Sequence, residues 1–216
     1  MPSAGRHVTA TPRAAIEDRL RGTSPGGDPL AAVLRSAPLD QHDRIRRAVP
    51  ADLAGAAVLL PIVDRAEGLT VLLTLRASHL KHHAGQISFP GGRIEAHDRS
   101  PWEAALRETE EEIGLAREFV TLAGYLPDQM VISGYKITPA VAFVRPGFEL
   151  RLDATEVADV FEVPLAFVLD PVNHLPQDRT YQGITLVTYE MPYQGRRIWG
   201  ATAQMLVSLY QLLQES

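Results

Sequence analysis

The sequence contains no cysteine, which excludes both a disulfide framework and thiolate chemistry. It also has no run of roughly 18 consecutive apolar residues, the length that a membrane-spanning helix needs. The first residues, Met1 to His7, lack the apolar core of a signal peptide. We therefore expect a cytoplasmic protein that does not contact membranes.

Positively charged residues are fewer than negatively charged ones. The chain has 21 basic and 26 acidic residues, a formal net charge of −5, and so lacks the broad basic field that holds a polynucleotide. A nucleic-acid partner is therefore not expected. At 216 residues the chain can bury a full hydrophobic core, and 45% hydrophobic with 22% charged residues is typical of a soluble globular protein.

The chain divides near residue 50. We expect residues 1–50 to form an N-terminal arm with short helices at Pro12–Leu20 and Asp40–Val49, separated by a break rich in glycine and proline at Thr23–Asp28. Residues 51–216 are then expected to form one domain.

Runs of apolar and β-branched residues predict the strands of that domain. The expected strands are Ala54–Val63, Leu69–Leu75, Val120–Leu126, Ile137–Val144 and Thr185–Met191. Besides the acidic helix described next, a short helix is expected at Leu165–Leu169 and an amphipathic one at Ala201–Leu213. Strands mixed with two main helices indicate an α/β fold, an α/β/α sandwich around a mixed β-sheet.

The most informative helix is expected to begin after Ser100, an N-cap residue followed by proline, and to stop at Gly114. Helical spacing predicts a buried stripe made of Trp102, Ala105, Leu106, Thr109 and Ile113. The acids on its surface should then point outward.

Three of those acids, Glu108, Glu111 and Glu112, stand at i, i+3 and i+4, on one helix face. Carboxylates so close repel one another, a cost that divalent cations between them would offset; Mg²⁺ prefers oxygen ligands and leaves room for substrate phosphates. The alternative is an ordinary solvated acidic face. Ahead of the helix, Phe89-Pro90-Gly91-Gly92 is expected to be a strand end that breaks into a glycine loop, whose amides can approach a ligand closely.

These residues resemble the signature of the Nudix hydrolases, G-x5-E-x7-R-E-U-x-E-E-x-G-U, in which U is a bulky aliphatic residue. The matching positions are Gly92, Arg107-Glu108, Glu111-Glu112 and Gly114-Leu115. The sequence departs from the signature at the acid six residues after Gly92, which is Asp98, and eight residues instead of seven separate it from Arg107. Glu95 is an alternative for that acid, and Thr109 stands where an aliphatic residue is usual.

A second pattern lies directly upstream. Leu72 to Ala77, then Lys81, Gly85 and Phe89 to Gly92, resemble the signature of the coenzyme A diphosphatase branch of that family, L-L-T-x-R-[SA]-x3-R-x3-G-x3-F-P-G-G. Lys81 departs from it, because the branch has arginine there and lysine lacks the bidentate fork for phosphate. The run from Ile198 to Ala203 also resembles this branch.

The resemblance implies an enzyme that hydrolyses coenzyme A or a related diphosphate to 3′-phosphoadenosine 5′-phosphate and 4′-phosphopantetheine, with Mg²⁺ or Mn²⁺ as cofactor. Glu108, Glu111 and Glu112 are then the expected metal ligands, and Glu111 is the candidate general base. Arg107 would orient a neighbouring glutamate. Arg76, Lys81, Gly91 and Gly92 are the candidates for binding the anionic substrate.

Several points stay open on the sequence alone. A Nudix hydrolase of another substrate, such as ADP-ribose or NADH, would suit the change at Lys81, and a non-catalytic nucleotide-binding protein could keep the same fold. An additional acid could come from Glu156 or Glu162, either of which could equally be a solvated charge. A homodimer is also left open.

Overall fold

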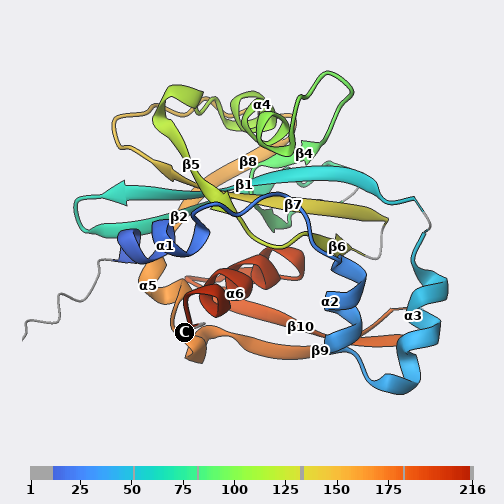
Figure 1. The fold of residues 1–216 in the computed structure, drawn as a ribbon. Coiled ribbons are helices and arrows are strands. Elements are labelled where there is room, and N and C mark those ends of the chain that lie inside the picture. The colour runs from blue at the N-terminus through green and yellow to red at the C-terminus, as the bar shows by residue number, and fades with distance from the viewer. Residues whose placement is uncertain (1–11, 51, 82, 132–133, 182, 215–216) are drawn as a thin grey trace, which may run out of the picture.

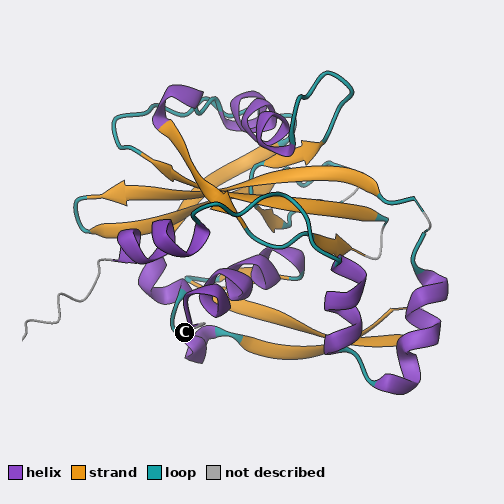
Figure 2. Ribbon diagram, viewed as in Figure 1, coloured by secondary structure: helices purple, strands orange, loops and turns teal. Residues whose placement is uncertain are grey.

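The computed structural model describes residues 12–50, 52–81, 83–131, 134–181 and 183–214. A large sheet lies across the middle of the molecule, with helix α4 (Pro101–Ile113) over one face and helix α6 (Ala201–Gln214) under the other (Figure 1). Figure 2 shows helices on both sides of this sheet. The expected α/β/α sandwich is confirmed.

The large sheet has eight strands and is mixed. Its main path runs β3-β2-β1-β7-β5; β4, β6 and β8 pair with β1, β7 and β2 respectively. Strands β1 and β7 are parallel, and the other pairs are antiparallel. The bounds are β1 Ala54–Arg65, β2 Gly68–Arg76, β3 Ile87–Ser88, β4 Gly91–Arg93, β5 Val120–Tyr125, β6 Gln129–Val131, β7 Tyr135–Val144 and β8 Val157–Pro164.

Each face of the sheet buries its own core, because side chains alternate along every strand. Leu59 and Leu72 pack with α4 residues such as Ala105 and Ile113 on one face. Leu60 and Leu73 pack with α6 residues such as Leu206 on the other. The two main helices are thus held by opposite faces of the same strands.

A second sheet was not expected from the sequence. It has three strands in the order β11-β10-β9, with bounds β9 Leu175–Tyr181, β10 Ile184–Tyr193 and β11 Arg196–Trp199. Only β10 contains an expected strand, Thr185–Met191. Strand β9 is mostly polar and exposed, so it lacks the alternation of apolar residues by which a strand is recognised in a sequence.

The N-terminal region contains α1 (Pro12–Leu20), α2 (Pro29–Ser36) and α3 (His42–Ala48), with a 3₁₀ turn at Leu39–Gln41. Helix α1 agrees with the expected bounds, α3 is shorter than the expected Asp40–Val49, and α2 was missed. Side chains tie this region to the second sheet, since Gln41 accepts a hydrogen bond from the Thr185 amide at 2.7 Å and Arg44 donates one to the Gly183 carbonyl at 2.5 Å. The division at residue 50 stays a prediction.

The short helix α5 (Leu165–Val168) lies where it was expected, and a 3₁₀ turn at Arg117–Phe119 leads into β5. Within the described residues, no helix combines the length and apolarity needed to cross a membrane.

Candidate active site

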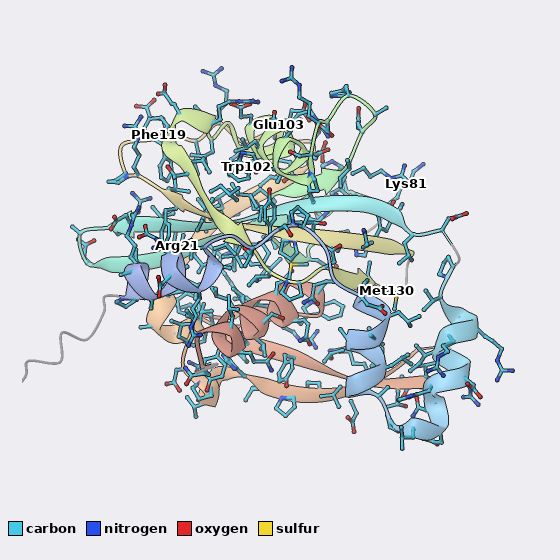
Figure 3. All side chains as sticks on the ribbon, viewed as in Figure 1. Arg21, Lys81, Trp102, Glu103, Phe119 and Met130 are labelled. Atoms are coloured by element: carbon cyan, nitrogen blue, oxygen red, sulfur yellow. The ribbon has the colours of Figure 1, made fainter. Side chains whose placement is uncertain are left out.

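Helix α4 begins and ends as its sequence predicts. The Ser100 side chain accepts a hydrogen bond from the Glu103 amide at 3.3 Å, Pro101 occupies the first turn, and Gly114 is left-handed with φ of 68°. All the expected stripe residues other than half-buried Trp102 are buried, and Trp102 packs against the core between α4 and the sheet (Figure 3). The helix is therefore fixed along its whole length.

The C-terminal end of α4 has a second anchor. The amides of Arg151 and Asp153 donate hydrogen bonds of 2.9 Å to the carbonyls of Ile113 and Glu112, two groups that the helix itself leaves unpaired. Glu156 follows this segment in the sequence, three residues after Asp153.

The three acids of α4 differ in exposure. The side chain of Glu111 is 60% exposed, that of Glu108 18% and that of Glu112 only 5%. The expectation that all three point outward is therefore wrong for Glu112. Its carboxylate turns inward because the Gly91 amide donates a hydrogen bond to it at 3.1 Å and the Arg76 guanidinium lies 3.7 Å away.

Arg107 holds the other two acids. Its Nη1 donates to Glu108 at 2.9 Å and to Glu111 at 3.0 Å, and its Nη2 donates to the Arg93 carbonyl at 3.0 Å. These bonds lock the guanidinium between α4 and β4. Such a geometry suits an orienting residue, the role expected for Arg107.

Asp98 is the remaining partner of Arg107. Its buried carboxylate accepts hydrogen bonds from Arg107 Nε at 3.1 Å and Nη2 at 3.0 Å, and from the Glu95 amide at 2.8 Å. The guanidinium holds the pKa of Asp98 below its usual range. The extra residue before Arg107 is thus absorbed in the loop, and Asp98 faces the arginine, whereas Glu95 is exposed.

Gly91 and Gly92 are not in a loop, contrary to expectation. They begin strand β4 and pair with Val58 and Ala57 of β1. A side chain at Gly92 would collide with the Glu108 carboxylate, 2.5 Å from its Cδ atom. One at Gly91, where φ is 147°, would collide with the backbone of β1. The glycines are needed for close packing of β4 against both β1 and the acids of α4.

Burial sets the ionisation of these acids. Desolvation raises the pKa of Glu112 to about 7, although the Gly91 amide and Arg76 oppose the shift. Desolvation also raises the pKa of Glu108, against the hydrogen bond from Arg107. The negative charge of Glu156 contributes to both upward shifts.

The structure separates the two candidates for an additional acid. Glu162 accepts hydrogen bonds from Arg65 and Thr70, and these bonds neutralise and occupy its carboxylate. Glu156 is exposed, and its negative charge raises the pKa of Glu108 and that of Glu112. Of the two acids, Glu156 therefore remains the candidate for an additional site residue.

Within the described part of the chain, no three histidine, aspartate or glutamate side chains already converge as a metal-binding group. Glu108 and Glu111 face Arg107, and Glu112 faces Gly91. The donor set nevertheless fits a divalent cation, because carboxylate oxygens are its preferred ligands and the charges of Glu108, Glu112 and Glu156 repel one another at this place. A cation would relieve that repulsion.

The upstream pattern folds against the same acids. Arg76 ends β2 with its guanidinium beside Glu112, and its Nε atom is buried without a hydrogen-bond partner. The following loop lies along the segment that carries Glu156, since the Ala77 amide donates to the Glu156 carbonyl at 2.8 Å and the His79 ring to the Thr155 carbonyl at 3.0 Å. Lys81 is exposed in this loop (Figure 3).

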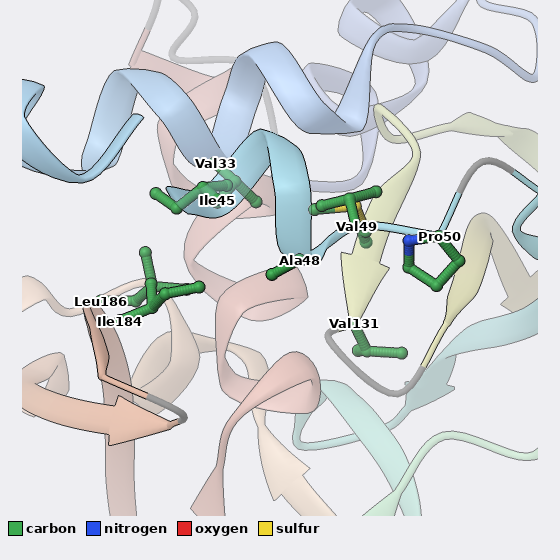
Figure 4. Close-up of a pocket in the computed structure, with 9 residues that line it drawn as sticks. Val33, Ile45, Ala48, Val49, Pro50, Val131, Ile184 and Leu186 are labelled. Atoms are coloured by element: carbon green, nitrogen blue, oxygen red, sulfur yellow. The ribbon is translucent and has the colours of Figure 1, made fainter. Parts of the chain in front are cut away.

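Among the described residues, one hollow lies beside α4 and another lies apart from it. An open polar depression beside the C-terminal end of α4 includes Glu111 and Asp153 in its lining. A small apolar pocket, bounded by α2, α3, β6 and β10, is lined by residues such as Val33, Ile45 and Val131 (Figure 4). The second has no titratable side chain in its lining, so the candidate chemistry lies at α4.

The comparisons with known proteins show the family of this chain. The family model described as NUDIX domain matches residues 53–181, more than half of the chain. The chain belongs to the Nudix family. Its relatives include two proteins named "Uncharacterized Nudix hydrolase NudL", from Salmonella paratyphi B and Salmonella newport, each 40% identical over 155 residues, covering 71% of this chain and 80% of the relative. Among solved structures, the Nudix hydrolase RenU from M. Smegmatis gives a TM-score of 0.46 and 25% identity, over 53% of this chain and 73% of that chain.

Membership of the Nudix family makes the protein a hydrolase of phosphoric anhydrides that acts on nucleoside diphosphate derivatives. Nudix hydrolases generally use divalent cations such as Mg²⁺ or Mn²⁺. Arg107 links Glu108 to Glu111, and Gly92 leaves room for the Glu108 carboxylate. Arg76 of the upstream pattern lies beside Glu112.

Proposed function

We propose that this Nudix hydrolase cleaves the diphosphate of coenzyme A or its derivatives, giving 3′-phosphoadenosine 5′-phosphate and 4′-phosphopantetheine. The observation that carries the proposal is the position of Arg76. The pattern that resembles the coenzyme A branch places this arginine beside Glu112, with a buried Nε that has no partner in the protein. A buried donor without a partner is costly, and a substrate phosphate oxygen would satisfy it.

Lys81 supplies a second positive charge for the same substrate. It extends from the loop that follows Arg76, beside the segment carrying Glu156. Coenzyme A has a 3′-phosphate besides its diphosphate, so an arginine beside Glu112 and a lysine five residues further along the chain match the two groups of negative charge. We assign Arg76 to the diphosphate and Lys81 to the outer phosphate.

Glu108, Glu111 and Glu112 are the proposed ligands of Mg²⁺ or Mn²⁺, with Glu156 as the additional acid. A bound cation would neutralise the diphosphate charge and acidify a coordinated water. Glu111, the most exposed of the three, is the candidate base that takes the proton of the attacking water. That water oxygen bonds to phosphorus while the P–O–P bridge breaks, leaving one phosphate of the former diphosphate on each product, in addition to the 3′-phosphate that stays on the adenosine.

Arg107 and Gly92 act on the acids instead of the substrate in this scheme. Arg107 donates to Glu108 and Glu111 at once and so sets their orientation relative to each other. Gly92 leaves the space that the Glu108 carboxylate occupies. The Gly91 amide is already bound to Glu112, so it positions an acid and would reach substrate only if that bond opened.

A second substrate class has one observation in its favour. Lysine at position 81 lacks the bidentate geometry that arginine offers to phosphate, which suits a diphosphate without the 3′-phosphate, such as ADP-ribose or NADH.

Turnover measured with Mg²⁺ and with Mn²⁺ over coenzyme A, an acyl-coenzyme A, ADP-ribose and NADH separates these possibilities. We expect the highest kcat/KM with coenzyme A or its acyl derivative. The Glu111→Gln variant, purified in parallel, controls for contaminating phosphatases. Hydrolysis of ADP-ribose with coenzyme A left intact would overturn the proposal, as would no turnover on any of the four.

A further inference from the structure

The segment 87–90, which leads into β4, is held by bonds from two layers of the molecule. Strand β3 has only two residues, Ile87 and Ser88, and makes a correspondingly short ladder with β2. Two threonines supplement this ladder. Thr74 of β2 donates to the Ser88 carbonyl at 3.1 Å, and Thr202 of α6 donates to the Ile87 carbonyl at 3.0 Å.

The chain between these bonds and Glu112 has little freedom. Phe89 is buried, proline fixes φ at position 90, and the Leu59 amide donates to the Pro90 carbonyl at 2.9 Å. The next amide is that of Gly91, which binds the Glu112 carboxylate at 3.1 Å. A displacement at Ile87 would therefore be transmitted over four residues to the hydrogen bond that orients Glu112.

Thr202 differs from the other groups that hold this segment because it comes from the opposite layer. Helix α6 lies under the sheet and α4 lies over it (Figure 1). Thr202 also lies outside residues 53–181, the part matched by the family model. Its side chain is buried, and this hydroxyl is the only contact that joins the first turn of α6 to β3 by a side-chain hydrogen bond among the described residues.

We propose that Thr202 is a positioning residue of the active site, which acts through the Ile87 carbonyl and the Gly91 amide to set the orientation of Glu112. The inference rests on the proposed metal-ligand role of Glu112. If so, helix α6 helps to orient an acid of the active site. This role would explain the threonine in the pattern Ile198 to Ala203.

The test compares Thr202→Val, which keeps the shape and removes the hydroxyl, with Thr202→Ser, which restores the donor. In the substrate-free protein we expect the Gly91 amide proton to exchange with solvent about tenfold faster in Thr202→Val, measured by NMR. We expect kcat to fall about tenfold with KM changed less than twofold, because small displacements of catalytic groups lower the rate strongly. Thr202→Ser should recover both quantities.

Ser208→Ala is the matched control. It removes another hydroxyl from α6, one that donates to the Gln204 carbonyl and accepts from Gln129, away from β3. Gly91 exchange and kcat should stay within twofold of the wild type. Should Thr202→Val not fold, Thr202→Ala takes its place.

A fall in melting temperature with unchanged Gly91 exchange and kcat would show a purely structural threonine and overturn the inference. Faster Gly91 exchange with unchanged kcat would overturn the role of Glu112 in the proposed function, and with it the claim that Thr202 positions a catalytic group. The exchange measurement needs no substrate, so a wrong substrate assignment leaves the link from Thr202 to Gly91 measurable on its own.

Discussion

Arg107 and Asp98 form a two-pronged ion pair, with Nε and Nη2 of the guanidinium each bound to a different carboxylate oxygen. Both side chains are largely buried, so the pair fixes the loop ahead of α4 as well as the arginine. Because the same guanidinium holds Glu108 and Glu111, the stability of the loop and the geometry of the acids are coupled.

Asp98→Asn should therefore weaken both stability and turnover. Breaking a buried, hydrogen-bonded ion pair leaves Arg107 partly uncompensated and should lower the free energy of unfolding by about 2–3 kcal/mol, a fall in melting temperature of roughly 4–12 °C. Thermal unfolding followed by circular dichroism measures it. Asp43→Asn, which removes an exposed ion pair with Arg46, should change the melting temperature by less than about 2 °C. Equal shifts in the two variants would contradict this account.

Glu112 should make the metal-free protein less stable as the pH rises. Burial raises its pKa to about 7 in the folded state from about 4.5 in the unfolded chain, so the folded state binds the extra proton between these values. The contribution of Glu112 to stability is then greatest below pH about 4.5 and is lost as the pH approaches 7. The free energy of unfolding is measured with urea, in EDTA, at pH 5 and pH 8 for the wild type and for Glu112→Gln. The change with pH in the wild type minus that in the variant gives the contribution of Glu112. A wild-type pH dependence that the variant retains in full would exclude Glu112 as its source.

Glu111→Gln should abolish most turnover and leave folding intact. Its side chain is largely exposed, so the substitution removes charge without opening a cavity, and a carboxamide is a poor base and binds cations poorly. We expect kcat to fall by about 10²–10⁴. The neighbouring Glu110 binds Arg117 outside the group of acids, and Glu110→Gln should keep kcat within about twofold. Normal activity of Glu111→Gln would remove Glu111 from the site.

Lys81 should affect KM only for substrates that carry the 3′-phosphate. Lys81→Met should raise KM for coenzyme A about tenfold and leave KM for 3′-dephospho-coenzyme A unchanged, because only the first offers the charge that Lys81 is proposed to bind. Lys81→Arg, which gains the bidentate fork, should lower KM for coenzyme A. Steady-state kinetics with both substrates provides the comparison. A parallel loss on both substrates would instead place Lys81 at the diphosphate or outside the site.

Local patterns predicted much of this protein. The span of α4 between Ser100 and Gly114, the strands β1, β2, β5 and β7 of the main sheet, and the helix α6 all follow from caps and periodicity, which act over a few residues. Strand β9 was missed because it is polar and exposed. Helix α2 was missed although Asp28 caps it and Pro29 occupies its first turn. The Gly91-Gly92 pair was expected in a loop, but it lies in a strand, where β1 leaves no room for a side chain at Gly91 and Glu108 leaves none at Gly92.

The sequence by itself determined that three glutamates and an arginine share one helix face, since their spacing and the helix are local properties. Only the tertiary structure decided which of them is buried, that Asp98 faces Arg107, that Glu162 is occupied by Arg65 and Thr70, and that Thr202 reaches Ile87. Those relationships depend on where strands and loops far apart in the chain come together on the two faces of one sheet. Glu112 is buried, and its pKa raised, beside groups that are far from it in the sequence, such as Gly91 and Arg76.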